Sequence, residues 1–206
     1  MALKYSLLPL SSSFFYVVFL VSSLHAFETV YEDVSFRGLD HDFQALLELR
    51  KTLGVESSVW DSSESPCGWF GVTCDEITAS DGVVMETRVV GLELDGKQLA
   101  GSLSPAIGRL SELEKLSFAD NLLGGRIPKE IGSCLKLEIV DLRGNKLYGP
   151  IPFEFSKLRS LKVLHLSDNS LSGEISFLSL RGNPDGLSDG PFPYLEYLNL
   201  ANNHLT

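Results

Sequence analysis

The stretch LEIVDLRGNKLYGPIP, residues 137–152, decides the fold of this chain of 206 residues. Its apolar residues follow neither the period of about 3.6 residues that a helix requires nor the alternation of a plain strand. The same pattern recurs 24 residues upstream, from Leu113, and 24 residues downstream, from Leu161. One further copy begins at Val89, and a fifth begins at Leu195 after a longer gap. Four starts at a constant interval identify a repeat array, whose units we number one to five.

Each unit predicts one short strand. Its LxxLxL segment places leucines on the inward side and other residues on the outward side, as a strand does. A single unit cannot bury its own leucines, so neighbouring units must cover one another. We therefore expect the strands of successive units to stack into a parallel sheet.

An asparagine follows this segment in units two to five. Its amide could donate to backbone carbonyls of adjacent turns that would otherwise be buried without partners. The alternative is a surface turn former. Lys97 stands at this place in unit one, as suits a less enclosed end repeat. The expected asparagine ladder comprises Asn121, Asn145, Asn169 and Asn203.

The first 26 residues have the layout of a secretory signal peptide. A single lysine, Lys4, precedes an apolar run from Phe14 to Leu20, and small residues lie near Ala26. The run is far shorter than the roughly 18 apolar residues of a membrane span, although an uncleaved signal anchor is an alternative. No later stretch is long enough to cross a bilayer. We expect a secreted, extracellular or apoplastic chain.

The chain has three cysteines, which would lie in an oxidising compartment. Cys67 and Cys74 are too far apart for a CxxC motif and have no histidine nearby, so we interpret them as a disulfide. Cys134 occupies a repeat position that neighbouring units fill with leucine. We expect an inert core residue there, with a reactive or intermolecular thiol as the alternative.

The tail Leu-x-Gly-x-Ile-Pro is complete in units two and three, at residues 123–128 and 147–152. With this tail, the pattern LxxLxxLxLxxNxLxGxIP over residues 89–206 resembles the plant leucine-rich repeat class of receptor-like kinase ectodomains and secreted inhibitors. The segment FQALLELRKTL at residues 43–53, Trp60 and CGWFGVTC resemble the amino-terminal cap of the same proteins.

The resemblance implies an α/β solenoid, a right-handed leucine-rich repeat superhelix with a parallel sheet on its concave face. It also implies an N-terminal helical disulfide cap, at residues 40–88. Residues 27–39 carry no pattern and are expected to form an irregular arm, and the acidic segment 75–87 a loop. Unit four is 10 residues longer than its neighbours, and the excess, SLRGNPDGLSDGPFP, predicts a lateral loop. The sequence stops at Thr206 within a repeat, which we interpret as a truncated product or an incomplete sequence.

No motif predicts catalysis. The central concave column should read Glu93, Ser117, Asp141, His165, Asn199, with roughly 4.8 Å between neighbouring strands. Asp141 lies between Ser117 and His165, whereas a catalytic triad needs the histidine in the middle. Glu93 and Asp141 are expected to be solvated on an open sheet, which does not suit the general acid of a glycosidase. GKQLAG is not a phosphate loop and the histidines form no metal cluster, so we expect no enzyme, cofactor or metal.

A recognition surface is the remaining interpretation. The flanking concave columns carry Lys115, Ile139, Val163 and Tyr197 on one side and Asp95, Arg143 and Ser167 on the other. Tyr197 and Arg143 are the expected anchors, because these residue types dominate binding surfaces. A net charge of −10 without a lysine or arginine run argues against nucleic acid. The candidate partner-binding residues are Glu93, Lys115, Asp141, Arg143, His165, Tyr197 and Asn199.

These observations favour an extracellular module that binds a protein or peptide, or a co-receptor, and that resembles the first part of a receptor-like kinase ectodomain. The resemblance implies the plasma membrane if the full-length product continues into a membrane span. Two alternatives are a secreted inhibitor of wall-degrading hydrolases, similar to polygalacturonase-inhibiting proteins, and a non-functional fragment whose last leucines lack a covering neighbour.

Overall fold

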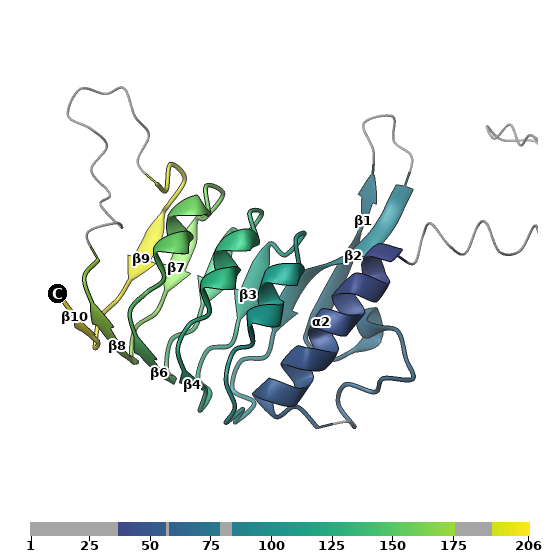
Figure 1. Ribbon diagram of the computed structural model, residues 1–206, viewed down its shortest axis with the longest axis horizontal. Coiled ribbons are helices and arrows are strands. Elements are labelled where there is room, and N and C mark those ends of the chain that lie inside the picture. The colour runs from purple at the N-terminus through teal and green to yellow at the C-terminus, as the bar shows by residue number, and fades with distance from the viewer. Residues whose placement is uncertain (1–36, 57, 79–83, 176–190) are drawn as a thin grey trace, which may run out of the picture.

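The computed structural model describes residues 37–56, 58–78, 84–175 and 191–206 (Figure 1). The chain forms a curved stack of coils that begins at the cap helix and ends at the last repeat (Figure 1). The expected signal peptide, most of the expected arm and most of the unit-four insertion lie outside the described residues. Within the described residues, no helix is long and apolar enough to cross a bilayer.

The cap begins with helix α2 (Arg37–Leu53), which has Asp40 in its first turn and Arg50 in its last, as the helix dipole favours. Its inner face buries leucines such as Leu46 and Leu49 against the first repeat. The helix starts six residues before the predicted segment 43–53, so residues 37–39 are helical and not part of an irregular arm. The loop that follows contains a short 3₁₀ helix, η1 (Pro66–Gly68).

Two strands continue the cap. β1 (Val72–Thr78) and β2 (Val84–Glu93) pair antiparallel from Val72 opposite Leu92 to Thr78 opposite Val84. The prediction of a loop over residues 75–87 was therefore wrong for most of that segment. The physical reason is that a strand exposed on its outer face accepts charged residues, and the antiparallel partner satisfies its backbone. This hairpin also covers the edge of the repeat sheet that would otherwise be open.

The repeats continue the same sheet with parallel strands. They are β3 (Lys115–Ser117), β5 (Ile139–Asp141), β7 (Val163–His165) and β9 (Tyr197–Asn199), in the order β1-β2-β3-β5-β7-β9. The inward residues pair in register along Leu92, Leu116, Val140, Leu164 and Leu198. The longer unit four does not disturb this register, because β9 pairs with β7 as β7 pairs with β5.

The other flank of each coil carries a second sheet and short helices. The sheet has the order β10-β8-β6-β4 and comprises β4 (Gly124–Gly125), β6 (Lys146–Gly149), β8 (Ser170–Gly173) and β10 (His204–Leu205). The 3₁₀ helices η2 (Pro105–Arg109), η3 (Lys129–Ser133) and η4 (Phe153–Lys157) follow in units one to three (Figure 1). The glycine of the LxGxIP tail is needed here, because Gly149 has a φ of +81°.

The asparagines lie between adjacent coils. The Asn145 amide nitrogen donates to the Phe118 carbonyl of the preceding unit at 2.8 Å and to the Leu142 carbonyl of its own unit at 3.1 Å. Its side-chain oxygen accepts from the Leu123 N–H at 3.0 Å. Asn121, Asn169 and Asn203 repeat this arrangement.

The cysteines divide as the sequence indicates. Cys67 and Cys74 form a disulfide that ties η1 to β1. Cys134 is fully buried, its thiol donates to the Ile107 carbonyl at 3.2 Å, and burial raises the pKa of that thiol to about 12. Trp60 is buried and stacks on Trp69 at 5.2 Å between ring centroids.

A buried ion pair joins the cap to the repeats. Arg88 of β2 donates twice to the Asp42 carboxylate of α2, from Nε and Nη2, each at 2.9 Å. The same carboxylate accepts from the Val89 N–H at 2.9 Å. The Asp42 carboxylate beside Arg88 raises the pKa of the guanidinium. Asp42 thus fixes the helix onto the first repeat strand.

Candidate functional site

The concave sheet brings the predicted central column into one row. Glu93, Ser117, Asp141, His165 and Asn199 occupy equal register positions on β2, β3, β5, β7 and β9. Each strand carries a different side chain at this position, while the inward positions are nearly all leucine. The variable residues of the repeat are therefore displayed together on a rigid support.

The far half of this row forms one hydrogen-bonded cluster around His165. Its Nδ1 lies 3.3 Å from Arg143 Nη1 and 3.7 Å from Asp141 Oδ2. Its Nε2 lies 3.0 Å from Ser167 Oγ and 3.1 Å from Asn199 Nδ2. Contacts on both ring nitrogens fix the orientation of the imidazole.

Arg143 and Tyr197 complete the cluster. The Arg143 guanidinium is paired with Asp141 and lies 3.7 Å from Asp120. The Tyr197 ring meets His165 edge-on, with 5.4 Å between centroids, and its hydroxyl accepts from Asn199 at 3.3 Å. Tyr197 is 45% exposed. We call Asp141, Arg143, His165, Tyr197 and Asn199 the His165 cluster.

Two predicted residues lie apart from this cluster. Lys115 pairs with Glu93 at 2.5 Å at the cap end of the row. Ser117 also belongs to that end, because its hydroxyl donates to Asp95 at 2.7 Å. Half-buried apolar side chains, Ile139 and Val163, occupy the flanking column between the two groups.

Several residues at the edge of the sheet were not predicted from the sequence. Asp120 and Asp168 lie three residues after the ends of β3 and β7, in the left-handed region, with φ of 54° and 57°. Asp168 accepts from Asn202 at 2.6 Å and from Ser167 at 2.7 Å, and these hydrogen bonds lower the pKa of its carboxyl group. The Asp that directly precedes Asn121 and Asn169 is the signal that could have located this row, because aspartate tolerates the left-handed conformation.

The serine and the histidine of the row itself are not in contact. The Ser117 hydroxyl donates to Asp95, and His165 lies two strands away. The serine that does contact His165 is Ser167, 3.0 Å from Nε2, and it donates its hydroxyl hydrogen to Asp168 at 2.7 Å. Within residues 37–56, 58–78, 84–175 and 191–206, no group of three histidine, cysteine, aspartate or glutamate side chains could hold a metal ion. The arrangement is suited to noncovalent recognition by hydrogen bonds, one guanidinium and one aromatic ring.

Repeated parallel strands, a buried amide ladder and a disulfide-bonded helical cap define a leucine-rich repeat solenoid with a polar concave sheet. Comparison with known families agrees: residues 39–75 match the leucine rich repeat N-terminal domain. Residues 112–134, 136–158 and 160–179 match the leucine rich repeat itself. The chain belongs to the plant leucine-rich repeat family, and the predicted α/β solenoid with its cap is confirmed.

Known relatives are plant receptor kinases. The LRR receptor-like serine/threonine-protein kinase EFR of Arabidopsis thaliana is 38% identical over 88 residues, which are 40% of this chain and 8% of that protein. The chain spans only 7–15% of the length of the first curated relatives it matches.

Solved structures give the same result over more of the chain. The ectodomain of the receptor kinase SOBIR1 of Arabidopsis thaliana is 33% identical, with a TM-score of 0.63, over 80% of this chain and 94% of that one. The ectodomain of the receptor kinase GASSHO1/SCHENGEN3 of Arabidopsis thaliana, in complex with CASPARIAN STRIP INTEGRITY FACTOR 2, is 34% identical with a TM-score of 0.62. That match covers 79% of this chain and 18% of that one.

Proposed function

We propose that this chain is an extracellular recognition module that binds a peptide or protein partner on its concave sheet, without catalysis. The His165 cluster is the observation that carries the proposal. Its side chains are already held in place by one another, so a partner would not have to order them on binding, and that lowers the entropic cost of association.

The chemistry of the cluster favours a polypeptide partner. Arg143 and Tyr197 are residue types that dominate binding energy, and both are partly exposed. Asp141 and Asn199 add hydrogen-bond acceptors and donors, and the neighbouring Ile139 and Val163 offer apolar contact. An extended peptide laid across the strands would meet a charged, an aromatic and an apolar position in turn.

The two groups on the row would have different roles. The Lys115–Glu93 pair is exposed on both sides and contributes little binding energy. We therefore assign it to orientation and assign the affinity to Arg143 and Tyr197. A co-receptor could use the same row, since a folded partner presents the same side-chain types.

The proposed cellular location rests on the cap and on the expected signal peptide. A disulfide within a cap of this kind forms in an oxidising compartment, which agrees with the signal peptide that we expect at residues 1–26. The similarity to receptor kinase ectodomains supports the same location. We propose that the module acts outside the cell, and at the plasma membrane where a longer product continues into a membrane span.

The test is a binding screen followed by matched variants. The purified chain, secreted with its disulfide, is screened against an array of synthetic plant secreted peptides and receptor ectodomains. For any binder, Arg143→Ala and Tyr197→Ala should each weaken the affinity about 30-fold, the effect of a hot spot near 2 kcal/mol. Lys51→Ala, on the exposed face of the cap helix, is the control and should leave affinity unchanged. An array with no binder, or a binder indifferent to both cluster variants, would count against the proposal.

A further inference from the structure

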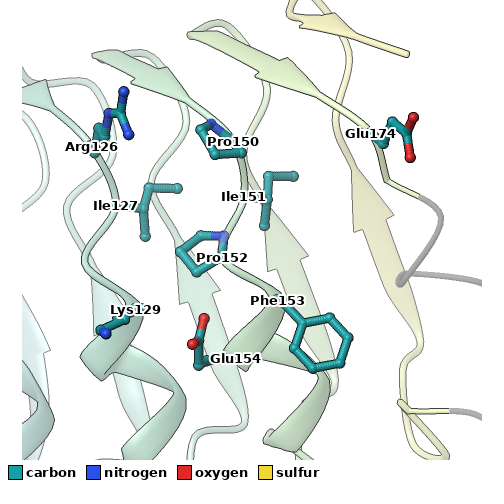
Figure 2. A pocket seen from close by; sticks show the side chains of 9 residues that line it. All are labelled: Arg126, Ile127, Lys129, Pro150, Ile151, Pro152, Phe153, Glu154 and Glu174. Carbon is teal, nitrogen blue, oxygen red and sulfur yellow. The ribbon is translucent and has the colours of Figure 1, made fainter.

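A groove lies on the flank of the solenoid away from the concave sheet, between the second sheet and the 3₁₀ helices. Its volume is ≈ 830 Å³ (Figure 2). The floor is apolar, made by Ile127, Pro150, Ile151 and Pro152, with the two isoleucines almost fully buried. It crosses units two, three and four, so three consecutive coils build it.

The charges of the groove are separated. Arg126 and Lys129 come from unit two and lie on one wall, and Glu174 lies on the opposite wall, from unit four (Figure 2). Glu154, from unit three, lies at the lower end between them (Figure 2). Within the described part of the chain, none of these four side chains forms an ion pair.

The lack of internal pairing distinguishes these cations from others of the repeats. Lys115, in the concave sheet, and Lys136 and Lys162, outside its strands, each pair with a glutamate of the neighbouring coil. Arg126 and Lys129 are exposed and have carboxylates within the same groove but not in contact. The groove therefore presents a cationic and an anionic wall, each available to an external partner.

An exposed aromatic ring stands at the rim. Phe153 opens η4 and is 64% exposed. The equivalent position is Lys129 in unit two and Pro105 in unit one, so the repeat does not require an aromatic residue there. The ring adds exposed apolar surface to the apolar floor of the groove, and contiguous exposed apolar surface is typical of a contact surface.

We propose that this groove is the interface through which two copies of the chain associate. We place a two-fold axis in the plane of the interface, along residues 150–153. Rotation about this axis exchanges the two walls of the groove, so that the cationic wall of one copy faces the anionic wall of the other. Arg126 of one copy then stands opposite Glu174 of the other, because the two side chains lie at the same level on opposite walls (Figure 2). Lys129 likewise stands opposite the end of the groove that holds Phe153 and Glu154. A surface that is complementary to itself in this way is what a two-fold dimer requires.

The groove is small, so the dimer is a weak one. Interfaces of limited area belong to the transient class, and association depends on protein concentration. The net charge of −10 opposes association at long range. At physiological salt, charges more than about 8 Å apart are largely screened, while the pairs at the contact remain. The matched walls are thus needed to bring the copies together in one orientation.

A charge-swap experiment tests the interface. Analytical ultracentrifugation of the secreted chain should show a concentration-dependent monomer–dimer equilibrium. The double variant Arg126→Glu with Lys129→Glu makes both walls anionic, and Glu154→Lys with Glu174→Lys makes both cationic. Each variant alone should dimerise at least about tenfold more weakly, and an equimolar mixture of the two should form a heterodimer at least as tight as the native dimer. Phe153→Ser should weaken the native dimer as well.

A control separates this surface from general charge effects. Lys51→Glu with Arg159→Glu reverses two exposed cations outside the groove and should leave dimerisation unchanged. Circular dichroism verifies that every variant is folded. A chain that stays monomeric at every concentration that remains in solution would overturn the proposal. Self-association that survives both groove variants, as contact through the leucines of the last repeat would, or a mixture that does not recover dimers, would overturn it too.

Discussion

Removal of single asparagines from the ladder should destabilise the chain by amounts that differ with position. The reason is that the side chains of Asn121, Asn145 and Asn203 pair with different numbers of backbone groups that have no other hydrogen-bond partner among the described residues. Asn121 accepts from two backbone donors, Lys97 N–H at 2.9 Å and Leu99 N–H at 3.1 Å, and donates to the Leu94 carbonyl at 2.8 Å. None of these three groups has another hydrogen-bond partner among the described residues.

Removal of the Asn145 side chain leaves fewer backbone groups unpaired. The carbonyls of Phe118, Leu142 and Arg143 that accept from it each keep a second donor, from Asn121, Asn169 and the Asp120 N–H respectively. Only the Leu123 N–H is left without a partner among the described residues when Asn145 is removed. At about 1–3 kcal/mol for a buried group left unpaired, and a fraction of that for each shared bond, Asn145→Ala should cost about 2–4 kcal/mol.

The same reasoning orders the other positions. Asn121→Ala leaves two to three groups unpaired and should cost about 3–6 kcal/mol, with the partly exposed Lys97 N–H reaching water. Asn203→Ala affects groups at the end of the stack, where Asn203 is only partly buried and water can replace the amide, so the cost should be about 1 kcal/mol.

Urea titration followed by tryptophan fluorescence and far-ultraviolet circular dichroism measures these free energies of unfolding. Both tryptophans lie in the cap, so fluorescence reports the unit-one end while circular dichroism reports the whole array. The expected order is Asn121, then Asn145, then Asn203. Equal losses for Asn145→Ala and Asn203→Ala, or a smaller loss for Asn121→Ala than for Asn145→Ala, would refute the reasoning.

Three further outcomes follow from the buried groups. Asp42→Asn removes the carboxylate that pairs with two nitrogens of the buried Arg88 guanidinium, leaves the partly exposed Glu86 as its charged partner, and should lower the free energy of unfolding by about 3–5 kcal/mol, measured by urea titration. Cys67→Ser with Cys74→Ser opens a loop with a sequence separation of 7 residues and should cost about 2.5 kcal/mol, with the same loss in the native chain under reducing conditions. Cys134, whose thiol pKa is raised to about 12 by burial, stays neutral at pH 8 and should react with a thiol reagent only in denaturant; rapid reaction of the folded chain would contradict this assignment.

The repeat pattern predicted most of the solenoid because one physical requirement is imposed at every coil. Leu116, Val140 and Leu164 must fill the same space, and each asparagine must satisfy carbonyls of two coils, so a change in sequence at these positions is costly. The register of β9 could be predicted across an insertion for the same reason, since its inward leucine restores the pattern wherever the chain returns.

Other parts of the fold had no such signal. The strands β4, β6, β8 and β10 are only two to four residues long, too short for an alternation to be recognised. The β1–β2 hairpin was missed because its charged outward residues resemble a loop, although Val72 and Ile77 mark strand positions. Side-chain contacts such as Arg143 with His165 depend on rotamers that spacing alone does not determine.

The division between required and variable positions also explains why this fold can carry two recognition surfaces. The leucines and asparagines are occupied by the interior, so a substitution at Asp141 or Tyr197 changes the concave surface without loss of a core contact. The same holds for Arg126 and Phe153 on the other flank, at positions where the neighbouring units carry different residues. The two surfaces lie on opposite flanks of the same coils, so binding on the concave sheet leaves the groove accessible. A dimer formed through the groove would therefore present two concave sheets at once, and a bivalent partner bound to one sheet would meet the second at a raised effective concentration.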